Sequence, residues 1–208
     1  MSERTKGMTS MRFFASLTTA QKIIAGVVVS CLLVLLAWVA YSMMPTASNQ
    51  GYSPEQPIPF SHQIHAGQYK IDCKYCHVGA ETSQHASIPS MNVCMNCHKA
   101  VKTESPWIQK LTKMYEEGKA IEWIRIHELP DHVRFNHSRH VKKGVSCQTC
   151  HGDVGGMQKV FQSAPLVMGW CLNCHRGRSV PENVKRLLEG QEKEDGSIAP
   201  FDCATCHY

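Results

Sequence analysis

The pattern of apolar and polar residues divides this chain of 208 residues into parts of different character. Residues 23–44, with the sequence IIAGVVVSCLLVLLAWVAYSMM, form one uncharged apolar run. Such a run is long enough for a helix to cross a hydrocarbon layer about 30 Å thick. Residues 45–59 are rich in Pro, Ser, Gly and Asn and predict an extended linker. From residue 60 onward the pattern predicts only short helices and irregular loops.

Two of these short helices have recognisable ends. Ser105 and Pro106 form a good N-cap and first-turn pair, and apolar residues follow at helical spacing as far as Gly118. A second short helix is predicted from Pro181 to Leu188, followed by the polar loop 189–197. Between these helices, residues 121–129 have an extended, half-apolar pattern. We expect these segments to serve as scaffold or as partner surface.

The cysteines repeat one motif along the second part of the chain. Of eleven cysteines, all except Cys31 fall in C-x-x-C-H pentapeptides. The five copies are CKYCH (73–77), CMNCH (94–98), CQTCH (147–151), CLNCH (171–175) and CATCH (203–207). A zinc ribbon or a thioredoxin-like pair explains neither the histidine at one fixed offset nor the odd number of pairs. The motif is typical of c-type haem attachment, in which both cysteines form thioethers and the histidine binds the iron.

This interpretation defines the first candidate site residues. The predicted attachment cysteines are Cys73, Cys76, Cys94, Cys97, Cys147, Cys150, Cys171, Cys174, Cys203 and Cys206. The predicted proximal iron ligands are His77, His98, His151, His175 and His207. About thirty residues per haem leave no space for a conventional apolar core, so we expect the haems themselves to form the core.

The haem motifs also predict the compartment, because c-type haem is attached outside the cytoplasm. A cleaved signal peptide would have a shorter apolar region that ends in small residues, so the run at 23–44 is interpreted as a retained anchor. Basic residues exceed acidic ones before it, which places residues 1–22 in the cytoplasm. The prediction is a single-pass protein of the bacterial inner membrane with a periplasmic haem domain that begins after the linker at 45–59.

The formal charge of +5 does not indicate a nucleic-acid partner. Each haem carries two propionates, so five haems add a charge of about −5 when ferric and about −10 when ferrous. The working protein is therefore near neutral to acidic.

An internal repeat organises the haem motifs. Residues 60–77, FSHQIHAGQYKIDCKYCH, match residues 135–151, FNHSRHVKKGVSCQTCH, and each copy places F-x-H-x-x-H before a haem motif. A second motif follows each copy and has a methionine three residues before its first cysteine. We therefore predict a first module at 60–98 with two haems, a connecting segment at 99–134 and a second module at 135–208 with three haems.

Seven histidines lie outside the motifs and are candidates for the second axial position of the irons. They are His62, His65, His85, His127, His132, His137 and His140. The two H-x-x-H pairs place their histidines on one side of a helical turn, where each can reach a different haem. We expect His127 and His132 to be solvated surface residues.

The F-x-H-x-x-H segments resemble those of the cytochrome c3 and c7 families. This resemblance implies a small, mainly α-helical and irregular multihaem cytochrome c with c3/c7-like modules and one N-terminal transmembrane helix. It also implies that His62 ligates the haem of His77, His137 that of His151, and His140 that of His207.

The remaining distal ligands are less well defined by the resemblance. Met91 and Met168 stand near the place where those families have a histidine, so we expect them to ligate the haems of His98 and His175. Packing in the core is the alternative role for both methionines. The reserve ligands are His65, for which the pattern offers no third haem site in its module, together with His85, His127 and Met157.

The sequence of residues 121–176, together with the anchor and the five motifs, resembles that of the pentahaem subunit, ActA, of alternative complex III. That resemblance implies an electron-transfer subunit, not an enzyme on its own, of a membrane quinol:cytochrome c oxidoreductase in a respiratory chain. The implied partners are an iron–sulfur subunit, polytopic membrane subunits, a monohaem cytochrome c and a periplasmic acceptor or terminal oxidase.

Two other functional classes fit less well. A multihaem reductase of nitrite needs an open iron position, whereas here the candidate distal ligands outnumber the haems. A membrane-anchored quinol dehydrogenase of the NapC type shares the N-terminal helix but has four haems and lacks the paired F-x-H-x-x-H segments. A single transmembrane helix forms no closed pocket for a quinol, which favours the subunit of a larger complex.

Overall fold

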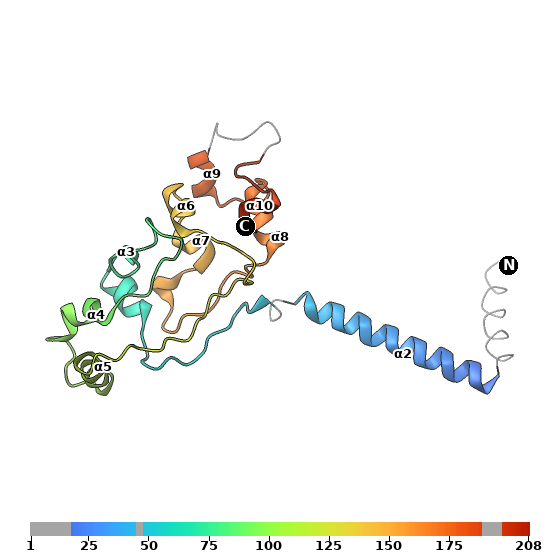
Figure 1. Ribbon diagram of the computed structural model, residues 1–208, viewed down its shortest axis with the longest axis horizontal. Coiled ribbons are helices and arrows are strands. Elements are labelled where there is room, and N and C mark those ends of the chain that lie inside the picture. Colours follow the sequence, from blue (N-terminus) through green and yellow to red (C-terminus); the bar gives the residue numbers. More distant parts are fainter. Residues whose placement is uncertain (1–17, 45–47, 189–196) are drawn as a thin grey trace. The chain divides into compact units, whose positions relative to one another are not determined.

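The computed structural model describes residues 18–44, 48–188 and 197–208, and within these ranges the chain is helical or irregular and has no β-strand (Figure 1). The elements are α2 (Thr19–Ser42), η2 (Gln63–Gln68), α3 (Cys73–Cys76), α4 (Met91–His98), α5 (Pro106–Glu116), α6 (His137–Lys142), α7 (Cys147–His151), η3 (Val154–Gly156), α8 (Met168–His175), α9 (Glu182–Leu188) and α10 (Cys203–Cys206). The predicted fold class is confirmed. Most of the predicted cytoplasmic tail and of the polar loop at 189–197 lies outside the described residues.

Helix α2 is the long apolar helix that the sequence predicts, and it forms a unit separate from the rest of the chain. It begins earlier than the apolar run because Thr18 and Gln21 form a capping box: the Thr18 hydroxyl accepts from the Gln21 backbone N–H, and the Thr18 N–H donates to Gln21 Oε1. Its most apolar window has a mean hydropathy of 2.8. Among the described helices, α2 is the one long and apolar enough to cross a membrane.

Residues 48–59 differ from the free linker that their composition suggests. The Gly51 N–H donates to the Gln162 carbonyl at 2.7 Å, and the side chain of Gln56 exchanges two hydrogen bonds of 2.9 Å with the backbone of Ile124. These contacts fasten the segment along its length to the haem domain. Prolines and polar residues allow an extended backbone, but here its hydrogen-bonding groups find partners in the protein instead of water.

An apolar cluster fixes the first part of the haem domain. Met95 of α4 and Leu111 of α5 are buried against Ile58. Helix α5 begins at Pro106 and ends just before Gly118, whose φ of +65° stops it, as the sequence predicts. Its apolar face packs on α4, and Met91 is part of the same cluster. This packing holds the second haem motif against the connecting segment.

The two modules of the repeat contact each other through reciprocal hydrogen bonds, each from the H-x-x-H segment of one module to a loop of the other. The Ser138 N–H at the start of α6 donates to the carbonyl of Ser83, in the loop after the first haem motif. At the equivalent place in the other module, the Gln63 N–H of η2 donates to the carbonyl of Met157, in the loop after the third motif. A Cβ at Gly67 would collide with the backbone of Gly155. The close approach of η2 and η3 therefore requires glycine at position 67. Each module therefore completes the other.

The haem domain is arranged as a row. Figure 1 shows α4 and α5 at one end of residues 48–208, α3, α6 and α7 in the middle, and α8, α9 and α10 at the other end. The fourth and fifth motifs thus lie far from the second, although all are carried by the same short helical turns.

One fully buried side chain joins three segments of this domain. The Gln162 amide Nε2 donates to the carbonyls of Ser48 at 2.7 Å and Ala164 at 3.1 Å, and its Oε1 accepts from the Glu128 N–H at 3.3 Å. Gln162 is 0 % exposed. Because the Gln162 amide is shielded from water, it depends on these backbone groups for its hydrogen bonds.

We expect Gln162→Leu to lower the free energy of unfolding by about 3 kcal/mol, because the backbone groups of three segments lose their shared partner. Thermal unfolding followed by circular dichroism measures the loss. Gln158→Leu is the matched control, since Gln158 is exposed and makes one hydrogen bond, to the Ser61 hydroxyl at 2.7 Å. Equal losses for the two variants would contradict a special role for the buried amide.

Candidate haem centres

All five C-x-x-C-H motifs adopt the same local structure, a single helical turn or the end of a short helix. Cysteines three residues apart on such a turn lie on one side of it, and the histidine follows immediately. The thiols of all these cysteines are free. This is the arrangement that thioether bonds to the two vinyl groups of one porphyrin require, with the histidine beneath the iron.

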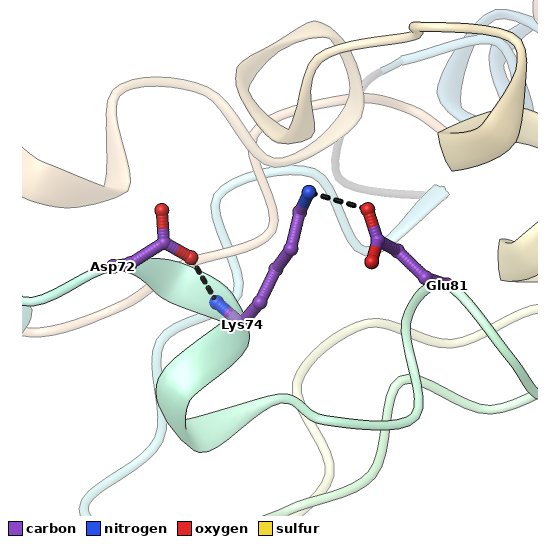
Figure 2. A network of polar contacts seen from close by, with 3 residues as sticks. All are labelled: Asp72, Lys74 and Glu81. Atoms are coloured by element: carbon purple, nitrogen blue, oxygen red, sulfur yellow. Dashed lines mark hydrogen bonds and ion pairs between the residues drawn. The ribbon is translucent and has the colours of Figure 1, made fainter.

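The first motif shows how the turn is fixed (Figure 2). The Asp72 carboxylate caps α3 by accepting from the Lys74 N–H at 2.7 Å. The Lys74 ammonium then forms an ion pair with Glu81, in the loop after the motif. The cap and the ion pair together tie the attachment turn to the loop that contacts the other module.

Four pairs of imidazole rings face each other across the domain, and each pair joins one histidine of an H-x-x-H segment to one histidine of a haem motif. The ring centroids are separated by 6.5 Å for His62 and His77, 6.4 Å for His137 and His151, 6.1 Å for His65 and His98, and 6.1 Å for His140 and His175. The rings of the first two pairs are nearly parallel, at 5° and 9°. Those of the last two are inclined at 63° and 44°.

These separations fit an iron between the rings. A metal ion that binds one nitrogen of each ring at roughly 2 Å holds the two centroids roughly 6 Å apart. The two copies of the repeat make the same pairs, the first histidine of H-x-x-H with the nearer motif and the second with the following motif. The repeat seen in the sequence therefore extends to the geometry of the candidate axial ligands.

Hydrogen bonds select the nitrogen that is available to a metal. In His77, His98, His65 and His140 the Nδ1 atom lies 2.7–3.0 Å from a backbone carbonyl oxygen, as it does in His137, where the oxygen belongs to Gln84. A carbonyl only accepts, so Nδ1 carries the hydrogen and Nε2 carries the lone pair. This is the usual arrangement of metal-binding histidines, in which the outer hydrogen bond orients the ring.

His151 differs from the other histidines in its Nδ1 partner. Its Nδ1 lies 3.2 Å from Nε2 of His127, whose ring stands at 79° to it with centroids 4.4 Å apart. The sequence predicts His127 to be a solvated surface residue, but the structure buries it partly and bonds it to a haem motif. No local pattern marks this contact, because 24 residues separate the two histidines.

Burial keeps several of these histidines neutral, the form in which imidazole binds a metal. Burial, followed by the nearby His77, lowers the pKa of His62 to about 4. Burial, followed by the nearby His127, also lowers the pKa of His151 to about 4. The pKa of His140 is lowered as well, chiefly by burial.

The partner of His140 differs from the sequence prediction. The structure places its ring against His175 instead of His207, and it places His65, for which the pattern gave no haem site, against His98. The signal that could have shown this was the repeat itself. Because His65 and His140 occupy the same position in their copies, they should contact the same motif of each copy.

The other reserve candidates occupy different surroundings. Met91 packs in the apolar cluster of α4 and α5, which is the alternative role considered for it. Met157 is buried where its loop contacts η2 of the first module, whereas Met168 and His85 are exposed. His132 stacks on His207 with centroids 5.3 Å apart, and its backbone carbonyl accepts from His207 Nδ1 at 3.0 Å. His132 therefore lies on the Nδ1 side of that ring, away from Nε2.

The thiols of different motifs influence one another's pKa. Burial raises the pKa of the Cys76 thiol, and Cys94 of the second motif raises it further. Burial and then Cys73 of the first motif raise the pKa of Cys147, in the third.

The same relation continues toward the other end of the domain. Burial, followed by Cys174 and Cys171 of the fourth motif, raises the pKa of Cys150 to about 11. Burial and then Cys206 of the fifth motif raise the pKa of Cys171. These influences agree with the arrangement of the motif helices along the domain, α4 for the second motif, then α3 for the first and α7 for the third, then α8 and α10 for the fourth and fifth (Figure 1).

Comparison with known proteins agrees with this chemistry. The family model described as cytochrome c3 matches residues 139–208. A curated protein of Nitratidesulfovibrio vulgaris, the multihaem cytochrome c subunit of menaquinone reductase, is 30% identical over 158 residues. That match covers 74% of this chain and 68% of the relative.

We expect Asp72→Ala to lower the free energy of unfolding by about 1 kcal/mol, because the first motif loses its cap. Asp72→Asn should change it little, since the amide oxygen still accepts from the Lys74 N–H. Lys74→Met should cost less than Asp72→Ala, because the ion pair with Glu81 is half-exposed and screened by water. Denaturant unfolding of the three variants measures the order, and a larger loss for Lys74→Met would contradict it.

Proposed function

The chain belongs to the family of the multihaem cytochrome c subunit of menaquinone reductase, and from this premise we propose that it is the pentahaem electron-transfer subunit of a membrane quinone oxidoreductase. Covalent c-type haems are implied by the cytochrome c3 match. Haem iron, when bound, supplies reversible one-electron transfer. The chain itself attaches the haems, orients their ligands and sets their order.

The proposed number of haems is five, one for each C-x-x-C-H motif. The attachment residues are the ten motif cysteines and the proximal ligands are His77, His98, His151, His175 and His207, as the sequence predicts. The common helical turn of all five motifs supports this assignment.

For the distal ligands, we propose four pairs of histidines. His62 and His137 serve the haems of His77 and His151, as the resemblance to cytochromes c3 implies. His65 and His140 serve the haems of His98 and His175 in place of Met91 and Met168, because their rings face those motifs at 6.1 Å. The distal ligand of the haem of His207 is left unassigned.

The observation that carries the proposed function is the single row of motifs. The short helices that hold the motifs follow one another along the domain, from α4 through α3 and α7 to α8 and α10 (Figure 1), and Asn96 of the second motif donates to the Tyr75 hydroxyl of the first at 3.1 Å. Haems attached to such a row stand next to one another. A row of this kind conducts electrons between its two ends, at α4 and at α10, and needs no substrate pocket along its length.

The proposed setting is a complex at the bacterial inner membrane. Helix α2 anchors the chain, with its N-terminus in the cytoplasm and the haem domain in the periplasm, as the basic residues before the helix and the site of haem attachment indicate. The partners are those that the resemblance to alternative complex III implies: an iron–sulfur subunit, polytopic membrane subunits that hold the quinone, and a monohaem cytochrome c or another periplasmic carrier.

The direction of electron flow is set by the partners at the two ends. The name of the relative denotes reduction of menaquinone, whereas the resemblance to alternative complex III implies oxidation of quinol and delivery to a cytochrome or a terminal oxidase. A row of haems serves both directions, because each step between neighbouring haems is reversible. The chain is therefore the electron relay, and other subunits oxidise or reduce the quinone.

Purification from membranes in a mild detergent tests the proposal. We expect mass spectrometry to find an iron–sulfur subunit and polytopic subunits bound to the chain, and to find five haem masses on the chain itself. Recovery of the chain alone, with direct reduction by menaquinol, would instead identify a NapC-type quinol dehydrogenase. Fewer than five haems would contradict the assignment of every motif.

The proposed ligands make a spectroscopic prediction. We expect His140→Leu to convert one haem from low spin to high spin, and Met168→Leu, the matched control, to leave the spectra unchanged. Electron paramagnetic resonance and near-infrared magnetic circular dichroism distinguish the two spin states and the two kinds of ligand. A His–Met charge-transfer band that disappears in Met168→Leu would restore methionine as the ligand.

A further inference from the structure

His127 lies outside both copies of the repeat, yet it contacts the haem motif nearest the middle of the row. It belongs to the connecting segment at 99–134. Its Nε2 lies 3.2 Å from Nδ1 of His151, and the two rings stand nearly perpendicular. The ring centroids of His151 and His137 lie 6.4 Å apart. When Nε2 of His151 ligates the iron, its hydrogen is on Nδ1, and His127 Nε2 accepts it.

The connecting segment holds His127 in this position from both sides. Three residues before it, Ile124 exchanges two hydrogen bonds of 2.9 Å with Gln56. One residue after it, the Glu128 N–H donates to the buried Gln162 amide at 3.3 Å. The guanidinium Nε of Arg125 also donates to the His127 carbonyl at 3.1 Å. An acceptor fixed at both ends orients the ring that it contacts.

This contact distinguishes two haem sites that the repeat would otherwise make alike. In the equivalent pair of the first module, His77 donates to the carbonyl of Ser87 at 2.7 Å, and the buried Nδ1 of His62 has no hydrogen-bond partner within the described structure. In the second module both rings are bonded, His137 to the carbonyl of Gln84 at 2.9 Å and His151 to an imidazole. Both outer nitrogens are thus hydrogen-bonded at the third motif, and the acceptor of the His151 ring is a side chain where that of the His77 ring is a backbone carbonyl.

We propose that His127 is a positioning residue that lowers the reduction potential of the haem held by His151, relative to the same site without this hydrogen bond. A hydrogen bond from Nδ1 makes the ligating imidazole a stronger electron donor, which favours the ferric iron. The same bond fixes the ring plane nearly parallel to His137. The inference rests on the proposed function, because it presumes a haem at this motif.

His127→Phe tests the proposal, because the phenyl ring fills the same space and excludes water but accepts no hydrogen bond from Nδ1. We expect the midpoint potential of one haem to rise so that its ferrous-to-ferric ratio at a fixed potential changes about fivefold. For a one-electron couple this change corresponds to about 40 mV. The rotation of the freed His151 ring should also change the low-spin electron paramagnetic resonance signal of that haem. The measurement is a spectropotentiometric titration of the purified protein with all its haems.

Two further variants separate the hydrogen bond from a general effect of substitution. His127→Gln places a carbonyl oxygen within reach of Nδ1, and we expect it to restore most of the native potential. His132→Phe changes the histidine that stacks on His207, but that motif is bonded through the backbone carbonyl of His132. It should therefore leave all the potentials unchanged. His127→Leu is measured in the same way if His127→Phe does not fold.

The outcomes distinguish the inference from the function on which it rests. Haem content is measured first, by mass spectrometry of each variant. Five haems in native and variant protein with no shifted potential in His127→Phe and His127→Leu would overturn the role of His127. An equal shift in His127→Gln would overturn it too, because the acceptor would then not matter. A native protein without haem at Cys147 and Cys150 would instead overturn the proposed pentahaem function.

Discussion

Few apolar side chains in residues 48–188 and 197–208 are buried by other protein groups, and the rest of the structure depends on this shortage. Within the described residues the buried apolar side chains are Ile58, Ala80, Met95, Leu111, Met157, Ala164 and Val184. Burial at about 25 cal/mol per Å² from so few groups cannot offset the entropy of ordering such a long chain. The covalent haems of this family supply apolar surface that the sequence does not. Short helical turns suffice because each one has to support a porphyrin edge, not a neighbouring helix.

The repeat resolves a second constraint, which is how two small modules stabilise each other. Each module sends its loop after the first motif to the start of the other module's H-x-x-H segment, through Ser83 and Ser138 in one direction and through Met157 and Gln63 in the other. The N–H groups of Ser138 and Gln63 thus each find their acceptor in the other module. The first and third motifs therefore meet at the contact of the modules, with the second motif on one side and the fourth and fifth on the other (Figure 1).

Much of the fold could be predicted from the sequence because its signals are local. The motif spacing gives the attachment turns, Pro106 and Gly118 give the ends of α5, and the apolar run gives α2. The partners of His65 and His140 could not be derived in this way, because H-x-x-H spacing shows only that two different sites are reached. The same limit applies to residues 48–59, whose composition suits a free linker equally well. Their partners, Gln162 and Ile124, are distant in sequence.

The equal pairing in the two modules also restricts how potentials along the row can differ. If four sites have two histidines each, the axial ligands contribute no difference between them. The backbone carbonyls that accept from most outer nitrogens are fixed by the fold and cannot be replaced by substitution. What remains adjustable is charge, solvent exposure and any acceptor that is a side chain. Among the outer hydrogen bonds of the four facing pairs in the described residues, His127 is the acceptor of that kind, and it comes from the connecting segment, which the repeat does not duplicate. A residue on such a segment changes the potential of one haem and leaves the corresponding haem of the other module unchanged. A substitution at a position that both copies of the repeat share achieves this less readily.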